Sequence, residues 1–394
     1  LSFTARSPSD PDNDVSLTVP SQDLADGLQY SATAGIPGLV DWIYGLLEIS
    51  HGRKKGEGWR VSVGSGSQDL IYKAVMAMVN DGDSVLVESP VYAGVIPMFQ
   101  TLHCDQIEVD TDARGICSDS LKSTLENWPA NKPKPKVLYT VPYGCNPTGM
   151  TATSERRRAV LALAREHDFI ILEGSSFRSV VFELHAKRVR VYAPRYPSYF
   201  QLELEEPEVG RVLRFDSLSK VLSAGIRIGF ASGPEPLLQA MDQHTATSNL
   251  QTSSLTQVIT LTLLKSWGYD GFAAHTSKVA QFYRARRDVF ESALQRHIKG
   301  LAEWSTPEAG MFFWFKLLVP STTAGSSEGD SETVIQTTAL ERGVLALPGT
   351  VFLPNGRKTA YVRAAFSLAT EWEVEEAVKR LRDAILEARA AAPA

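Results

Sequence analysis

The chain has 394 residues, more than one hydrophobic core usually supports, so we expect two domains. It is 43% hydrophobic and 22% charged, which is typical of globular proteins, and its net charge of −5 disfavours a nucleic-acid or anionic-membrane partner. Three cysteines without CxxC spacing disfavour a disulfide framework or a zinc site and indicate a reducing, cytoplasmic location. No apolar run has the length of a membrane-spanning helix.

In chain order, residues 1–27 are rich in Ser, Asp and Pro and predict an irregular arm. From Gly64 onward, short apolar strands alternate with helices, a pattern that predicts a mostly parallel α/β sheet. Ser67 is the predicted N-cap of the first helix. The predicted helices cover 68–79 and 154–167, and the predicted strands cover 84–87, 136–141, 169–172, 212–215 and 226–231. In such sheets, ligands bind at the loops that leave the carboxyl ends of the strands.

Beyond about Ser232 the pattern becomes helical, through 278–297, and a second mixed unit follows. Its predicted elements are strands at 310–318 and 360–366 and a helix at 371–387. We therefore expect a large domain over 51–298 and a smaller α+β domain over 299–394. The Ser- and Gly-rich stretch 322–330 predicts a surface loop.

The stretch FDSLSKVLSAGIRIGF, at 215–230, places Lys220 between hydroxyl residues and a following arginine. A lysine amine can form a Schiff base with an aldehyde cofactor. The side chains of Ser217, Ser219 and Arg227 can hold a phosphate. Together these residues indicate a site for pyridoxal 5′-phosphate (PLP), an aldehyde that carries a phosphate. A lone lysine would favour a plain solvated loop, but the motifs elsewhere in the chain favour the cofactor site.

Four further motifs support a PLP site, although each has a plain structural alternative when taken alone. GSGSQ is a turn that enters a helix, so the N–H groups at Ser67 and Gln68 can bind phosphate. In SPVYAG, Tyr92 can stack on a pyridine ring, or it can simply line a loop. In YGCNPTG, Asn146 can donate to the cofactor's phenolate oxygen. In YVRAAFS, Arg363 lies in an apolar strand and needs a substrate carboxylate or a structural ion pair.

From Leu28 to its C-terminus the chain resembles the class I/II aminotransferases of fold type I. It is most similar to the branch of α-aminoadipate/kynurenine and fungal aromatic aminotransferases. The motifs that carry the resemblance are LQYSATAGIP, GSGSQ, SPVYAG, VPYGCNPTG, DSLSK with GIRIGF, and YVRAAFS. The resemblance implies PLP as cofactor, Lys220 as the Schiff-base lysine, and Arg363 and Asn146 as substrate contacts. It also implies that Tyr92 stacks on the ring and that Asn146 contacts the phenolic oxygen. The residues that it implies for the phosphate cradle are Ser67, Gln68, Ser217, Ser219 and Arg227.

The resemblance also implies a homodimer with shared active sites, in which Tyr30 reaches the phosphate of the neighbouring subunit. Residues 1–50 would form an arm and a segment that contributes to the small domain and the dimer interface, and 51–298 would be the PLP-binding domain. The family's glycine-rich N-terminal stretch is absent. Since the chain starts at Leu1 rather than Met, we expect that a preceding piece is missing.

The sequence departs from the family at the edge that should hold the pyridine nitrogen. Where the branch usually has E-D-D-P-Y-Y, this chain has EGSSFR at 173–178. In the family, the first aspartate keeps the nitrogen protonated, and its position is Gly174 here; the following tyrosine is Phe177. Glu173 should point to the opposite face of its strand, Ser175 could hydrogen-bond only an unprotonated nitrogen, and Arg178 would disfavour protonation. We therefore expect a weaker electron sink than in an ordinary aminotransferase.

Three functions are compatible with these residues. The first is transamination between an aromatic or 2-aminoadipate-like amino acid and a 2-oxo acid, in which Lys220 also moves a proton. The second is a diverged PLP enzyme of secondary metabolism, such as a lyase, decarboxylase, racemase or carbon–carbon bond-forming enzyme, because the ring-nitrogen aspartate is Gly174. The third is a PLP-binding effector domain without turnover.

Overall fold

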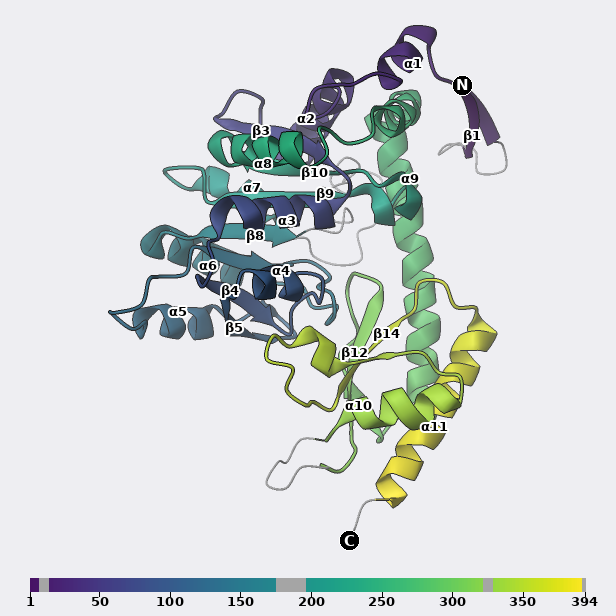
Figure 1. The fold of residues 1–394 in the computed structure, drawn as a ribbon. Coiled ribbons are helices and arrows are strands. Elements are labelled where there is room, and N and C mark those ends of the chain that lie inside the picture. The colour runs from purple at the N-terminus through teal and green to yellow at the C-terminus, as the bar shows by residue number, and fades with distance from the viewer. Residues whose placement is uncertain (7–13, 175–195, 322–328, 392–394) are drawn as a thin grey trace.

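The computed structural model of the chain describes residues 1–6, 14–174, 196–321 and 329–391. Its main feature is an eight-stranded sheet. The strands are β3 (Trp59–Gly64), β4 (Ser84–Ser89), β5 (Asp105–Asp112), β6 (Gly115–Ile116), β7 (Val137–Thr140), β8 (Ile170–Gly174), β9 (Val212–Ser217) and β10 (Gly229–Pro234). They lie in the order β3-β10-β9-β8-β7-β4-β5-β6, and the neighbours from β9 to β5 are parallel. The predicted mostly parallel α/β sheet is thereby confirmed (Figure 1).

Helices cover both faces of this sheet because both faces are apolar. One core cluster joins the sheet to α3 (Ser67–Met78), α4 (Ile96–Thr101) and α8 (Glu235–Ser248). A second cluster, on the other face, joins it to α2 (Pro37–His51), α5 (Ser118–Glu126), α6 (Ser154–His167), α7 (Tyr199–Leu202) and the first half of α9 (Ser254–His297). A 3-10 turn, η3 (Glu203–Glu205), follows α7. Because helices cover both faces, the ends of the strands are where a ligand can reach the sheet.

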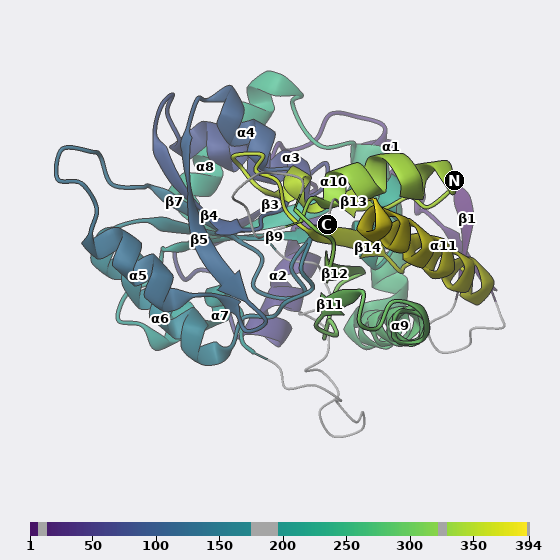
Figure 2. The ribbon, with the colours of Figure 1, turned by 90° about the horizontal axis from the view of Figure 1, so that it is seen from below.

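The long helix α9 leads from the large sheet to a second, smaller sheet, as Figure 1 shows. The smaller sheet has the order β11-β12-β14-β13. Its parts are β11 (Ala302–Trp304), β12 (Phe312–Leu317), α10 (Ser331–Val334), the π-helical turn η6 (Ile335–Ala339), β13 (Leu347–Pro348), the 3-10 turn η7 (Gly349–Phe352), β14 (Tyr361–Ala365) and α11 (Glu371–Ala390). Phe313 and Phe315 point from β12 into a third core cluster shared with α9 and α11, which lie side by side in Figure 2. The domain boundaries at 50 and 298 stay a prediction.

The N-terminal residues differ from the irregular arm that the composition predicts. Strands β1 (Ser2–Arg6) and β2 (Asp14–Thr18) pair in an antiparallel ladder, and α1 (Ser21–Gly27) follows them. Pairing of two short strands supplies the backbone hydrogen bonds that a polar composition does not reveal. The predicted loop at 322–330 falls mostly outside the described residues.

Two glycines bring the large and small domains into backbone contact. A Cβ on Gly144 would lie 2.7 Å from the amide nitrogen of Gly310, closer than real Cβ contacts allow. Gly144 belongs to the loop after β7, and Gly310 precedes β12. The small domain therefore packs directly against a loop at the carboxyl edge of the large sheet.

Among the described residues, no helix is both long and apolar enough to cross a bilayer.

Candidate active site

The predicted site residues follow neighbouring strands of the large sheet. Strands β4, β7, β8 and β9 are adjacent and parallel, so their carboxyl ends meet at one edge. The segments beyond those ends carry Tyr92, Asn146 and Lys220, and Gly174 is the last residue of β8. Residues more than 100 positions apart in the sequence are thus brought to one edge, which is where ligands bind in such sheets.

Arg227 organises the side of the site that was predicted to hold phosphate. Its Nη1 donates to Ser219 Oγ at 3.1 Å, and its Nη2 donates to the backbone oxygen of Ser65 at 3.0 Å. The residue has left-handed backbone angles, φ 50° and ψ 47°, which are strained for a side chain other than glycine. This conformation also explains why the predicted strand at 226–231 begins only at Gly229. The strained turn aims the guanidinium at the Ser65–Ser67 loop.

Glycines allow that loop to approach the turn. A Cβ on Gly66 would lie 2.5 Å from Arg227 Nη2, and one on Gly229 would lie 2.8 Å from the amide nitrogen of Ser67. Gly66, rather than the predicted Ser67, is the N-cap of α3, and no side chain caps the helix. The prediction was wrong by one residue because glycine reaches the φ of 99° that this N-cap position adopts. The amide groups of Ser67 and Gln68 therefore begin a helix and keep their capacity to bind an anion.

Lys220 lies at the end of the short helical turn η4 (Leu218–Lys220), directly after β9. Ser217 caps this turn by accepting a hydrogen bond from the amide of Ser219 at 3.2 Å. Partial burial lowers the pKa of the Lys220 amine below the usual 10.5, and the positive charge of Arg227 lowers it further. Lys220 has no ion-pair partner in the described part of the chain. Its amine therefore becomes neutral, and thus nucleophilic, at a lower pH than an ordinary lysine amine does.

Arg363 is a half-buried cation without a carboxylate partner among the described residues. Its Nη1 donates to Asn146 Oδ1 at 3.0 Å, and its Nε is buried without any hydrogen bond. The rings of Phe312 and Phe352 lie 4.2 and 5.0 Å from its guanidinium carbon. The alternative of a structural ion pair is thus disfavoured, and the orientation of Asn146 leaves its amide nitrogen as a donor.

Tyr92 lies within electrostatic reach of both arginines. Burial raises the pKa of its phenol, while the positive charges of Arg363 and Arg227 lower it. Beside it, Gln68 donates from Nε2 to the backbone oxygen of Gly94 at 2.8 Å, and its Oε1 is buried without a partner. The structure therefore gathers Tyr92 and Gln68 with the arginines, whereas Tyr30 is 79% exposed on the surface.

Glu173 cannot serve the edge of the site where Gly174 lies. Its side chain is about 1% exposed, forms an ion pair with Arg214 at 3.0 Å and accepts hydrogen bonds from the amides of Tyr199 and Phe200. Arg214 also pairs with Asp216 at 2.8 Å. The expectation that Glu173 points away from Gly174 is confirmed. Ser175, Phe177 and Arg178 lie outside the described residues.

Comparisons with known proteins agree with this arrangement. A family model described as aminotransferase class I and II matches residues 21–381. The chain belongs to this family. It is 39% identical over 366 residues to aminotransferase tdiD of Emericella nidulans, covering 93% of this chain and 81% of the relative. It is 35% identical to the mitochondrial kynurenine/alpha-aminoadipate aminotransferase of Mus musculus, covering 91% and 83%.

A solved structure adds the fold and the cofactor class. Kynurenine aminotransferase from Pyrococcus horikoshii, crystallised with PMP, has a TM-score of 0.81 and 27% identity and covers 92% of this chain and 83% of its own. The present aminotransferase is thus a PLP-dependent enzyme of fold type I, as predicted. The matches support transamination over the two other functions, the diverged PLP chemistry and the effector domain.

The residues of this aminotransferase fit PLP at the phosphate, aldehyde and phenolate positions. The anion-binding start of α3 and the guanidinium of Arg227 suit the phosphate, the amine of Lys220 suits the aldehyde, and the amide nitrogen of Asn146 suits the phenolate. At the remaining edge, neither Glu173 nor Asp216 is a free carboxylate, because both are bound to Arg214. Sequence reasoning missed this buried triad, although charged residues in apolar strands are a signal for one.

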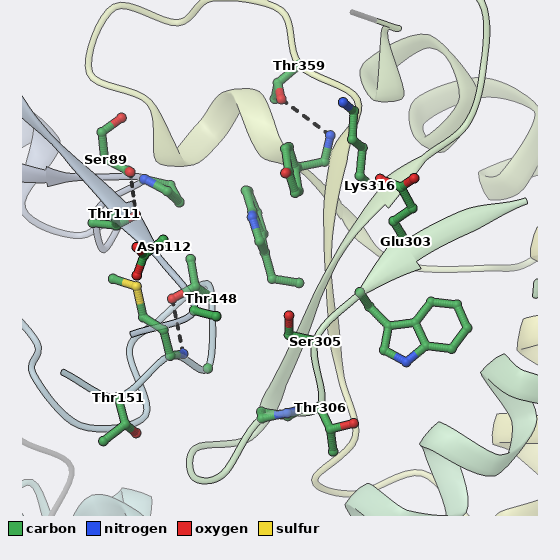
Figure 3. A pocket seen from close by; sticks show the side chains of 18 of the residues that line it. Ser89, Thr111, Asp112, Thr148, Thr151, Glu303, Ser305, Thr306, Lys316 and Thr359 are labelled. Carbon is green, nitrogen blue, oxygen red and sulfur yellow. Dashed lines mark hydrogen bonds between the residues drawn. The ribbon is translucent and has the colours of Figure 1, made fainter. Parts of the chain in front are cut away.

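A cavity of about 660 Å³ lies between the two domains of the aminotransferase (Figure 3). In Figure 3, Ser89, Thr111 and Thr148 of the large domain face Glu303 and Lys316 of the small one.

Lys220, Asn146 and Arg363 do not line this cavity. Trp314, which does, packs against Phe352 at 5.7 Å, and Phe352 in turn packs against Arg363. The cavity is therefore an interdomain cleft separated from Arg363 by aromatic rings.

Proposed function

We propose that this aminotransferase transfers the amino group of an aromatic or 2-aminoadipate-like amino acid to a 2-oxo acid. The observation that carries the proposal is the pair of basic groups without carboxylate partners among the described residues, Lys220 and Arg363. A half-buried guanidinium needs an anion, and a bidentate carboxylate suits its planar donors. A lysine amine of lowered pKa is the nucleophile that an aldehyde cofactor requires.

Each residue at the site has a separate task. Bound PLP supplies an electron sink for the electrons left at the substrate's Cα. Lys220 binds the aldehyde and moves a proton at Cα. Arg227, Ser219 and Ser217, with the start of α3 at Ser67 and Gln68, would hold the phosphate. Tyr92 would cover the ring, and Asn146 would donate to its phenolic oxygen.

The aromatic rings around Arg363 support a large substrate. Phe312 and Phe352 flank the guanidinium, and Trp314 packs on Phe352. Rings at the carboxylate site favour an apolar or aromatic side chain on the amino acid. The names of the relatives, which include kynurenine/alpha-aminoadipate aminotransferases, agree with an aromatic substrate through kynurenine and are the support for 2-aminoadipate.

A panel of amino acids tests the substrate class. The purified holoenzyme is incubated with phenylalanine, tryptophan, kynurenine, 2-aminoadipate, alanine or aspartate plus 2-oxoglutarate, and glutamate is measured by mass spectrometry. We expect kcat/KM to be highest for the aromatic amino acids or 2-aminoadipate. Equal or better turnover of alanine or aspartate would contradict the proposal.

An arginine variant tests the carboxylate contact. Arg363→Lys should lower kcat/KM by about 10- to 100-fold, mainly through KM, because lysine lacks the planar pair of donors. Arg380→Lys, at a partly exposed arginine that pairs with Glu376 on α11, is the matched control and should leave KM unchanged. An unchanged KM in Arg363→Lys would contradict the assignment.

We also infer a cytoplasmic homodimer in which Tyr30 completes the neighbouring site. The support is that Tyr30 is 79% exposed in the single chain and that the described cysteines are free. Tyr30→Ala and Lys220→Ala proteins, each with little activity alone, should regain activity when unfolded and refolded together. One site of a mixed dimer then has both native residues. No recovery, with dimers present, would contradict a shared site.

A further inference from the structure

The space beside Gly174 is occupied by a tyrosine hydroxyl. A Cβ built on Gly174 would lie 3.1 Å from Tyr139 Oη and 3.0 Å from Val141 Cγ2, which is tighter than most real Cβ contacts. Strands β7 and β8 are parallel neighbours in which Tyr139 pairs with Leu172. Because side chains alternate along a strand, Tyr139 and Gly174 lie on the same face. The absence of a side chain at 174 is therefore what leaves room for the hydroxyl.

The Tyr139 hydroxyl is a neutral donor without a partner. It makes no hydrogen bond to any other residue that the structure describes, although a buried tyrosine hydroxyl usually finds one. Only 2% of the residue is exposed. Burial raises the pKa of the phenol well above 10.0, and the nearby groups of Tyr92, Cys145 and Glu88 raise it further.

The cofactor's own geometry turns its nitrogen toward this region. In PLP, the nitrogen and the carbon that carries the aldehyde lie on opposite sides of the ring. A ring bound at its aldehyde by Lys220, at its phosphate by Arg227 and at its phenolic oxygen by Asn146 has its nitrogen directed away from Lys220. Position 174 is where the resemblance places the residue that meets this nitrogen.

We propose that the hydroxyl of Tyr139 donates a hydrogen bond to an unprotonated pyridine nitrogen of PLP, in place of the missing carboxylate. The proposal rests on the PLP site described above. A neutral phenol keeps its proton in this contact, so the ring nitrogen stays uncharged and withdraws electrons less strongly. The site would thus hold the cofactor by its phosphate and use a milder electron sink.

Nitrogen-15 NMR of the holoenzyme tests the contact directly. Wild type, Tyr139→Phe and Tyr199→Phe are loaded with PLP labelled at the pyridine nitrogen. Tyr199 is the control because it is a buried tyrosine with an unpartnered hydroxyl that belongs to the cluster on the other face of the sheet. We expect an unprotonated, hydrogen-bonded nitrogen in wild type and in Tyr199→Phe. In Tyr139→Phe, the resonance should move downfield and PLP affinity should fall by about three- to tenfold.

A second pair of variants tests whether the Tyr139 hydroxyl occupies the space that a side chain at position 174 would need. Gly174→Asp alone should be crowded by the hydroxyl and bind PLP less tightly than Gly174→Asp/Tyr139→Phe. In the double variant, the carboxylate has room and should stabilise a ring nitrogen that has taken up a proton from solvent, which moves the resonance upfield and raises transaminase activity.

Two results would overturn the inference: a protonated nitrogen in wild type, or a Tyr139→Phe spectrum identical to that of wild type. The wild-type spectrum decides even if a variant does not fold. Failure of wild type to bind PLP at Lys220 would instead contradict the proposed function itself.

Discussion

The phosphate side and the nitrogen side of the proposed PLP site are built from opposite kinds of residue. The phosphate side has a fixed cation, Arg227, two glycines that allow close backbone approach, and the start of a helix. The nitrogen side has Gly174 and the uncharged hydroxyl of Tyr139. Anion binding needs charge, whereas the strength of the electron sink depends on what meets the ring nitrogen. We therefore expect the phosphate side to provide more of the cofactor binding and the nitrogen side to set the strength of electron withdrawal.

The largest expected effect comes from removing Lys220, the lysine that binds the aldehyde of PLP between the phosphate side and the nitrogen side. Lys220→Ala should abolish the absorbance band of lysine-bound PLP and lower turnover by about a thousandfold or more. Lys278→Ala, a lysine on α9, is the control and should keep the band. A persisting band in Lys220→Ala, with no borohydride-trappable adduct on wild type, would contradict the cofactor assignment.

The next effect concerns the strands that support both sides. Arg214→Met leaves the buried carboxylates of Glu173 and Asp216 without their cation and should lower the free energy of unfolding by about 3–5 kcal/mol. Arg158→Met, which breaks an exposed pair with Glu205, should cost less than about 1 kcal/mol. Chemical denaturation measures both. Equal effects of the two substitutions would show that the triad does not hold β8 and β9 together.

A smaller effect distinguishes the two sides directly. Arg227→Gln should weaken PLP binding by about 10- to 100-fold, because it removes a charge-assisted contact to phosphate. Tyr139→Phe should weaken it less, since it removes a hydrogen bond between neutral groups. Equilibrium dialysis of PLP against both proteins gives the order. A larger loss in Tyr139→Phe would reverse the comparison.

The smallest effect is a shift along the pH axis. Binding of PLP to Lys220 requires the neutral amine, so the loading rate of apoenzyme should rise with pH through a midpoint below 10.5. Arg227 lowers that pKa, and Arg227→Gln should therefore move the midpoint to higher pH. The measurement is the rate of band formation in a pH series with saturating PLP. A midpoint that moves to lower pH in the variant would contradict this electrostatic role of Arg227.

Local motifs predicted much of the fold and the contacts around Lys220. The helix at 154–167 has the predicted bounds, because the apolar pattern and the capping residues that determine them are close together in the sequence. Arg227 and Ser219 are eight positions apart and meet as the motif suggested. The aminotransferase family and its fold followed from such motifs.

Contacts between distant strands were not predictable in the same way. Glu173 meets Arg214 across 41 positions, and Tyr139 reaches Gly174 only because β7 and β8 pair in one particular register. The hairpin β1–β2 was missed because its polar strands have no apolar pattern to mark them. The N-cap of α3 was misplaced because a glycine can take the position of a capping serine.

The most direct test of transamination at this site is the stoichiometry of a complete turnover. Holoenzyme is supplied with an aromatic amino acid and 2-oxoglutarate, and the products are quantified by mass spectrometry. We expect glutamate and the aromatic 2-oxo acid in a one-to-one ratio, and neither product from Lys220→Ala. Consumption of the amino acid with release of carbon dioxide, or with another product and no glutamate, would contradict it.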